Sequence, residues 1–242
     1  TGGSDSYLIS DLVASALDRL EAEGGAGDPV LAAWREVLPE LRGAFTLVML
    51  DRGRLIAARD RHGLRPLVLG RLDDGWVVAS ETAAIAAVGA SVVRQVAPGE
   101  LVTVDAEGVK SLRWTESRPR ACLFEYVYFT RADSELDGRS VYEARFDAGR
   151  RLAVRAPRPD ADYVVGVPDA GTPAALGFAA EAQIPFAQGF VRSPYAGRTF
   201  IQPAQHLRLA EVGLKLAPIR PVVEGKRLVV VDDSIVRGST QQ

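Results

Sequence analysis

The chain has 242 residues, of which 47% are hydrophobic and 25% are charged, and its formal net charge is -2. This composition is typical of a globular protein and excludes a disordered chain, and the length suits one large or two ordinary domains. A nearly neutral charge without a sustained basic run argues against nucleic acid as the main partner, and no signal peptide or apolar span of membrane length is present. The single cysteine, Cys122, excludes an internal disulfide framework and leaves a reducing cytosol as the default compartment.

The N-terminal part is expected to form two helices. Apolar residues between positions 8 and 20 recur at the spacing of one buried helix face, and Ser4 or Asp5 is expected to cap that helix. A glycine-rich break at 24–29 ends it. Residues 29–41 then predict a second amphipathic helix, which is interrupted near Pro39.

From Gly43 the hydrophobic period changes to that of short strands. The strands are expected at 44–50, 54–58, 67–70, 76–80, near 92–96 and at 101–104, with a small helix at 80–88. The first two should form a hairpin, and strands joined by such tight turns, including the turn 97–100, predict an antiparallel sheet. The charged segment 59–66 is interpreted from its residues as a loop with a glycine turn rather than a site.

Residues 114–120 lose periodicity and include Pro119, which indicates a domain boundary and divides the chain into 1–118 and 119–242. Alternating large apolar and aromatic residues predict a strand over 122–129. A helix is expected at 140–153 and a further short strand at 184–190.

Two apolar strands in the second half each stop at carboxylates. Residues 162–167 lead to Asp169, a small loop at 170–173 and a helix at 174–182. Residues 228–231 lead to Asp232 and Asp233 and a loop rich in Ser, Gly and Thr. In an open α/β sheet, ligands bind at the carboxyl ends of the strands, and free backbone N–H groups there suit a phosphate. The paired acids suit sugar hydroxyls and a hard divalent cation, although the pair alone fits equally a turn with a helix N-cap.

The string DDSIVRGST at 232–240 resembles the phosphoribosyl-pyrophosphate (PRPP) motif of type I phosphoribosyltransferases, in the form found in amidophosphoribosyltransferases. The strings RGAFTLVML, RDRHGLRPLVLG, VVASETAA and VAPGELV resemble, in this order, the glutaminase domain of the same family. The segment from Cys122 to Ser134 resembles its signature CxxEYVYFxRxDS. The resemblance is colinear and covers essentially the whole chain.

This resemblance implies an α/β and α+β fold: the C-terminal part of an N-terminal-nucleophile (αββα) glutaminase domain, followed by the first part of a type I phosphoribosyltransferase domain with a Rossmann-like parallel sheet. It implies the first step of purine synthesis, in which glutamine, PRPP and water give 5-phosphoribosylamine, pyrophosphate and glutamate. The N-terminal cysteine nucleophile of the family is not in this sequence, which begins at Thr1 and stops at Gln242, so we expect a piece of a longer protein, inactive alone.

The family's functional residues carry over position by position. The substrate-binding residues implied are Asp5 for glutamine, and, for PRPP, Arg192, Arg198, Asp232, Asp233, Ser234, Ile235, Val236, Arg237, Gly238, Ser239 and Thr240. Asp232 and Asp233 are also the implied magnesium ligands. Cys122 matches a cysteine that some members use as the first of four ligands to a [4Fe-4S] cluster. The resemblance further implies a cytoplasmic homo-oligomer without nucleic-acid or membrane partners.

Several positions depart from the family pattern. Tyr7 stands where an acidic residue is usual, Ala170 where Ser or Thr is usual, and Ser193 where asparagine is usual. Arg192 replaces the usual lysine and Ala132 the usual proline. Tyr7, Ala170 and Ser193 favour the alternative of a degraded copy that binds nothing. The other alternative is a regulatory homologue that binds PRPP without chemistry, against which the glutaminase-like half argues.

Overall fold

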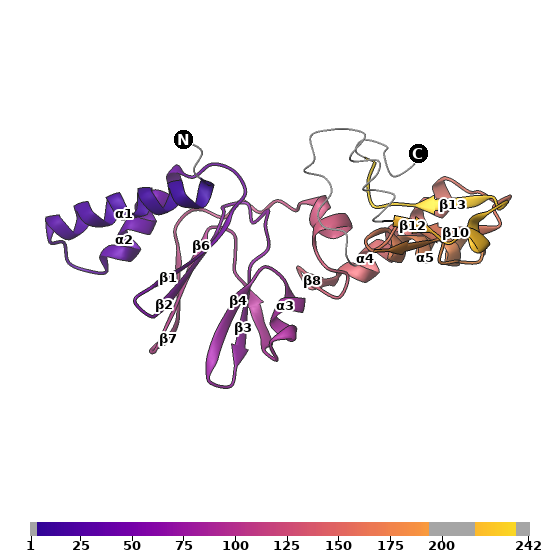
Figure 1. Ribbon diagram of the computed structural model, residues 1–242. Helices are drawn as coiled ribbons and strands as arrows, with labels where there is room; N and C mark the ends of the chain where they lie inside the picture. Colours follow the sequence, from indigo (N-terminus) through magenta and orange to yellow (C-terminus); the bar gives the residue numbers. More distant parts are fainter. Residues whose placement is uncertain (1–3, 194–215, 236–242) are drawn as a thin grey trace. The chain divides into compact units, whose positions relative to one another are not determined.

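The computed structural model describes residues 4–193 and 216–235, and its chain divides into two compact units (Figure 1). The first unit extends to Ala121, except for Glu81–Ala83, which belong with the second unit that starts at Cys122. The sequence placed a boundary at 118/119, within the aperiodic stretch that precedes this division. Among the described residues, no helix is long and apolar enough to cross a membrane.

The first unit begins with the two expected helices, α1 (Asp5–Glu23) and α2 (Pro29–Val37). Ser4 is the N-cap residue of α1, but its side chain makes no capping hydrogen bond. The expected interruption near Pro39 is confirmed, because α2 gives way to the 3-10 turn η1 (Leu38–Glu40). The helices pack against each other through buried residues that include Val13, Ala16 and Trp34.

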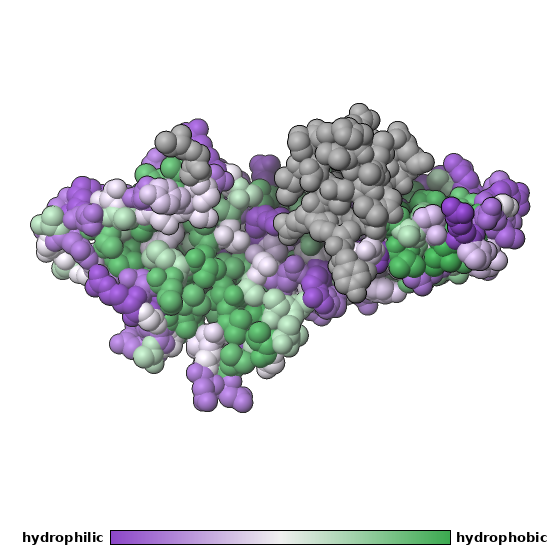
Figure 2. Space-filling model, in the orientation of Figure 1, coloured by the Kyte–Doolittle hydropathy of each residue, from purple (hydrophilic) through white to green (hydrophobic). Residues whose placement is uncertain are grey.

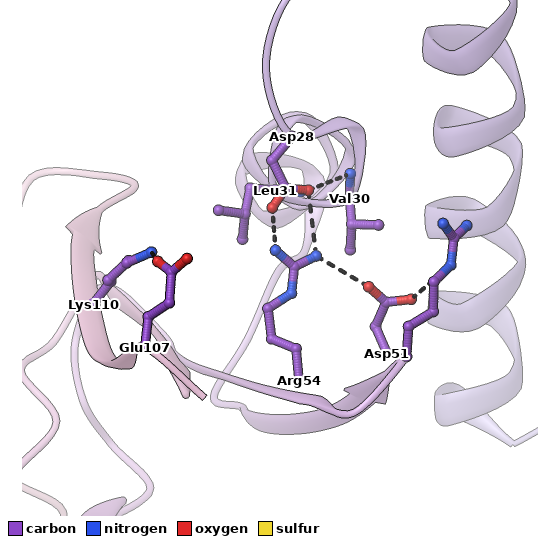
Figure 3. Close-up of polar contacts among 8 residues, drawn as sticks. Asp28, Val30, Leu31, Asp51, Arg54, Glu107 and Lys110 are labelled. Carbon is purple, nitrogen blue, oxygen red and sulfur yellow. Dashed lines mark hydrogen bonds and ion pairs between the residues drawn. The ribbon is translucent and has the colours of Figure 1, made fainter. Parts of the chain in front are cut away.

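The second helix starts from a cluster of charged groups shown in Figure 3. The Asp28 carboxylate accepts hydrogen bonds from the backbone N–H groups of Val30 at 3.0 Å and Leu31 at 3.2 Å, and it forms an ion pair with Arg54. Arg54 also binds Asp51, at 3.0 Å. The hydrogen bond from Arg54 holds the pKa of Asp28 below its usual value. One carboxylate therefore caps α2 and joins it to the strand that carries Arg54.

Two antiparallel sheets follow, where the short strands predicted one. The first has the order β1-β2-β6-β7 and consists of β1 (Thr46–Asp51), β2 (Arg54–Arg59), β6 (Glu100–Asp105) and β7 (Gly108–Arg113). The second has the order β4-β3-β5 and consists of β3 (Val68–Leu72), β4 (Gly75–Ala79) and β5 (Ser91–Gln95). The β1–β2 hairpin is confirmed, whereas β7 was not predicted.

The strands on either side of the turn 97–100 do not pair with each other, although a single sheet was expected there. β5 pairs with β3, and β6 pairs with β2 and β7. The turn instead redirects the chain, because the buried Glu100 carboxylate accepts a 2.6 Å hydrogen bond from the Ala97 N–H and binds Arg94 through both oxygens at 2.7 and 2.9 Å. This ion pair, in which Glu100 is buried and Arg94 is partly exposed, connects the two sheets.

The alternation of side chains in β2 explains how the layers stack. Ile56 and Ala58 pack against α1 and α2, whereas Ala57 belongs to a cluster against which Val78 of the other sheet packs. The side chain of Ile85, in the small helix α3 (Thr82–Ala87), packs against Gly70 of β3. The first unit is therefore layered helix, sheet, sheet, helix, and Figure 2 shows apolar residues concentrated over its sheets.

The loop 59–66 is structural, in agreement with its interpretation from the residues. Asp60 is buried, and its carboxylate accepts hydrogen bonds from the backbone N–H groups of His62, Gly63 and Leu64 at 2.8 to 3.2 Å. The buried Arg59 donates to the carbonyl oxygens of residues 63, 65 and 96. These two side chains provide hydrogen-bond partners for the backbone N–H and carbonyl groups of an irregular, partly buried segment.

The second unit is built around a parallel strand pair with two helices. β10 (Tyr163–Gly166) pairs with β13 (Leu228–Val231), and α4 (Val141–Arg155) packs on α5 (Gly171–Ala182). The helices approach very closely, because a Cβ on Gly149 would lie 1.8 Å from the Ala174 carbonyl oxygen and one on Gly177 would lie 1.9 Å from that of Phe146. The remaining elements are the strand pairs β8 (Glu135–Leu136) with β9 (Arg139–Ser140) and β11 (Phe190–Arg192) with β12 (Leu216–Pro218), and the short helix α7 (Arg220–Val223).

Two sequence predictions for this unit were wrong, and a third placed the start of a helix three residues too late. Residues 123–129 are helical rather than extended, and the segment η2 (Glu125–Phe129) is a π-helix that Thr130 closes by donating its N–H to the Glu125 carbonyl at 3.2 Å. The strand at 184–190 is reduced to one parallel bridge between Phe186 and Val164, since Pro185 has no N–H for a ladder. The helix expected at 174–182 already begins at Gly171, because Ala170 has helical dihedral angles.

Candidate functional site

The carboxyl ends of β10 and β13 lie side by side. Gly166 is the register partner of Val231, and the N–H of Val167 continues the pairing by donating to the Val231 carbonyl at 2.9 Å. Gly171, the first residue of α5, comes so close to this end that a Cβ there would lie 2.7 Å from the same carbonyl oxygen. Three carboxylates follow directly: Asp169 after β10, and Asp232 and Asp233 after β13.

Asp169 and Arg192 form an ion pair next to the end of β10. Both side chains are exposed, and the Asp169 carbonyl accepts from the Thr172 N–H at 3.4 Å as α5 begins. The structure thus brings Arg192, a predicted phosphate-binding residue, to the expected edge of the sheet. Asp169 was predicted only as the end of a strand, and its pairing with Arg192 could not be inferred from a separation of 23 residues.

Asp232 and Asp233 directly follow β13, and both residues are half-buried. The Asp233 N–H donates to Asp232 Oδ1 at 2.9 Å, and the Ser234 hydroxyl donates to Asp233 Oδ1 at 2.5 Å. Burial raises the pKa of Asp232, and the neighbouring charge of Asp233 raises it further. Ile235 is exposed, and the predicted residues Val236, Arg237, Gly238, Ser239, Thr240 and Arg198 lie outside the described residues.

The chemistry of the two acids fits a magnesium ion. Magnesium takes oxygen ligands and is commonly bound by one or two carboxylates together with water and substrate phosphates. Within residues 4–193 and 216–235, no group of three His, Cys, Asp or Glu side chains could hold a metal by itself. Asp232 and Asp233 would therefore supply part of the coordination, and a phosphorylated ligand and water would complete it.

The other predicted site residues with a described structure belong to other elements. Asp5 is exposed in the first turn of α1, in the first unit. A carboxylate there stabilises the helix, because it lies near the positive end of the helix dipole. Cys122 is a half-buried free thiol at the start of the second unit, and its carbonyl accepts from the Glu125 N–H at 3.1 Å. The structure brings Arg192, Asp232 and Asp233 to one unit and leaves the relation of Asp5 to them undescribed.

Comparisons with known proteins show which families this chain is similar to. Residues 14–87 match the family model of a glutamine amidotransferase domain. The amidophosphoribosyltransferase of Mycobacterium tuberculosis is 54% identical over 93% of this chain and 43% of its own length, and the chloroplastic enzyme of Vigna aconitifolia is 47% identical over 98% of the chain and 47% of its own length. The fold is that of a glutamine amidotransferase domain joined to a parallel-sheet unit.

Solved structures agree with the sequence relatives. The glutamine PRPP amidotransferase from B. subtilis, complexed with ADP and GMP, superposes with a TM-score of 0.83 at 41% identity over 99% of this chain and 51% of that one. A structure described as the allosteric regulatory enzyme of purine biosynthesis gives a TM-score of 0.82, also at 41% identity. The chain is thus related over nearly its whole length to the amidophosphoribosyltransferases, and it spans about half the length of these relatives.

Proposed function

We propose that this chain is part of a glutamine-dependent amidophosphoribosyltransferase, the enzyme that opens purine synthesis. The observation that carries the proposal is the diacid Asp232–Asp233 at the end of a parallel strand, in a chain whose first unit matches a glutamine amidotransferase domain. The reaction converts glutamine, PRPP and water into 5-phosphoribosylamine, pyrophosphate and glutamate. The proposed domains are the amidotransferase part at 1–118 and the phosphoribosyltransferase part at 119–242.

The PRPP end of the reaction is assigned to the edge formed by β10 and β13. Asp232 and Asp233 would accept hydrogen bonds from the vicinal ribose hydroxyls and would help to hold magnesium, which would supply positive charge for the pyrophosphate. The backbone N–H groups of the loop 234–240 bind the 5′-phosphate, and Arg192 and Arg198 bind phosphate oxygens. Catalysis here consists of positioning and charge neutralisation, since the ammonia that attacks the anomeric carbon needs no further activation.

The glutamine end is assigned to the first unit. The exposed carboxylate of Asp5 is proposed to bind the α-ammonium group of glutamine. The nucleophile does not come from these 242 residues, because their one cysteine is Cys122, whose nitrogen is a peptide nitrogen and cannot act as its base. Glutamate release therefore belongs to the whole protein and not to this polypeptide.

Cys122 remains a candidate ligand of a [4Fe-4S] cluster. Such a cluster takes four thiolates, and the sequence holds one, so these residues alone do not fit it. We derive no step of the reaction from it. Iron analysis of the complete gene product and of its Cys122→Ser variant tests this ligand.

The proposal includes a cytoplasmic homo-oligomer that acts on small molecules. The single cysteine supports a reducing compartment, and light scattering of the purified protein measures the oligomeric state. The alternative of a degraded copy rests on Tyr7, Ala170 and Ser193. Ala170 is the N-cap residue of α5 and makes no side-chain capping bond, where a hydroxyl is usual in the family.

The test uses the complete reading frame from which this chain comes, expressed and purified. PRPP-dependent release of glutamate and pyrophosphate from glutamine and magnesium-PRPP is expected. PRPP binding without turnover of glutamine or of added ammonia would select the regulatory alternative. Absence of both binding and turnover would select the degraded copy.

A further inference from the structure

A carboxylate that the proposed reaction does not use lies beside a predicted phosphate-binding arginine. The segment that leads to β11 runs parallel to β10: Phe186 and Val164 form a parallel bridge, and the Ala187 N–H donates to the Val164 carbonyl oxygen at 2.9 Å. Both segments therefore advance towards the carboxyl end of β10, where Asp169 and Arg192 form an ion pair. Their parallel course explains why an acid and an arginine so far apart in the sequence meet at this edge.

This ion pair is of a kind that a ligand can replace. The side chains of Asp169 and Arg192 are 72% and 48% exposed, so neither group leaves a buried environment when the two separate. Exposed ion pairs contribute little to stability, because water competes for both charges. Within the described part of the chain, the Arg192 guanidinium contacts Asp169 through one nitrogen, Nη1. Its other N–H groups can therefore bind a second anion while the pair still exists.

The pyrophosphate of PRPP is the anion that would reach Arg192. The proposed function assigns the 5′-phosphate to the loop 234–240 after β13, whereas Arg192 lies beside the end of β10, the neighbouring strand. Phosphate oxygens accept parallel N–H bonds from the planar guanidinium as well as a carboxylate does. A phosphate group and Asp169 cannot take the same donor, and two anions close to one cation repel each other. Asp169 therefore opposes the ligand at this arginine.

We propose that Asp169 competes with the pyrophosphate group for Arg192: it holds the arginine before the ligand binds, yields it to PRPP, and weakens the hold of the site on the pyrophosphate product. This inference rests on the proposed function, since it takes PRPP as the ligand. It gives Asp169 a role opposite to that of a binding residue, because its carboxylate lowers the affinity. The ion pair keeps Arg192 at the edge of the sheet and costs part of the affinity in return.

The test is calorimetric titration of the complete gene product with magnesium-PRPP and, separately, with magnesium-pyrophosphate. We expect Asp169→Asn to tighten the binding of both by about threefold, the size expected when one exposed ion pair no longer has to be replaced. Asp162→Asn is the matched control. Asp162 lies at the other end of β10 and forms an exposed pair with Arg227 at 3.4 Å, so this variant removes the same charge away from the site and should leave both affinities unchanged.

A second comparison separates competition for Arg192 from general repulsion of the ligand by the Asp169 charge. Asp169→Asn is repeated in an Arg192→Gln background. If Asp169 acts by occupying the guanidinium, the gain in affinity should be lost there, because the variant offers no arginine to compete for. The same gain in both backgrounds would show that the carboxylate only repels the ligand, and it would overturn the inference.

Thermal unfolding checks that the variants fold. The backbone carbonyl of Asp169, which accepts from the Thr172 N–H at 3.4 Å, is kept in Asp169→Asn, and Asp169→Ser is the second neutral variant if the first does not fold. Unchanged or weaker binding by the folded neutral variant, with binding by the wild type, would overturn this inference alone. Absence of magnesium-PRPP binding by the wild type would refute the proposed function, and this inference with it.

Discussion

Gly171 touches the end of the neighbouring strand: a Cβ on this residue would lie 2.7 Å from the Val231 carbonyl oxygen and 3.2 Å from the Cα of Asp232. The first turn of α5 and the end of β13 are therefore in direct backbone contact. A side chain at position 171 would separate the two strand-end segments on which the candidate site is built.

The variant Gly171→Ala should lose about 1–3 kcal/mol of unfolding free energy, because the added methyl group meets backbone atoms that must move. It should also weaken PRPP binding, since Asp232 moves with Val231. Denaturant unfolding and calorimetry measure the two effects. Gly25→Ala is the control, because a Cβ at Gly25 meets nothing within 4 Å. Equal losses in both variants would contradict the contact.

The cap of α2 predicts a stability effect that depends on pH. Asp28→Ala should cost about 1–2 kcal/mol, whereas Asp28→Asn keeps an acceptor for the helix and should cost less. Arg54 holds the pKa of Asp28 below its usual value of about 3.9, so the stability from ionised Asp28 is present above that value. The difference in unfolding free energy between the wild type and Asp28→Asn should therefore shrink as pH falls from about 4 through the lowered pKa. A difference independent of pH would show that the ion pair contributes nothing.

Two ion pairs in the first unit should differ strongly in their contributions to the free energy of unfolding. Glu100 is buried and receives two bonds from Arg94 and one from Ala97, so Glu100→Gln should cost about 2 kcal/mol. Lys110 and Glu107 form an exposed pair, and Lys110→Met should change stability by less than about 0.5 kcal/mol. Chemical denaturation of both variants measures the loss of unfolding free energy. Similar losses in the two variants would contradict the burial of Glu100.

A polypeptide of residues 1–242 should release no glutamate from glutamine. Its only thiol, Cys122, is half-buried within the chain and lacks the free α-amino group that would serve as its base. A coupled glutamate assay on the purified polypeptide checks this. Turnover that is abolished by alkylation of Cys122 would show that the nucleophile has been misassigned.

The sequence predicted the strand pair that forms the site because both strands carry a strong local pattern. Residues 228–231 are a continuous apolar run that stops at two acids, and 162–167 repeat the same pattern, which is typical of parallel strands buried on both faces. The β1–β2 hairpin was likewise predictable from two strands separated by a glycine turn.

The prediction failed where contacts distant in sequence decide the structure. A short apolar run such as 122–129 fits a strand or a helix equally well from periodicity alone. Arg145, 19 residues after Tyr126, binds the carbonyl oxygens of the π-helical turn, and no local pattern reports this contact. Arg145 also looks like any arginine of an amphipathic helix, so its burial could not be predicted.

The most direct test of the account is the affinity of the complete gene product for magnesium-PRPP when the diacid is neutralised. The variant Asp232→Asn/Asp233→Asn is compared with Asp73→Asn/Asp74→Asn, an identical change to an exposed Asp-Asp pair in the β3–β4 turn. We expect no detectable binding by the first variant, wild-type affinity of the second, and glutamine hydrolysis retained in both. Wild-type affinity of the Asp232→Asn/Asp233→Asn variant would contradict the assignment of the PRPP site.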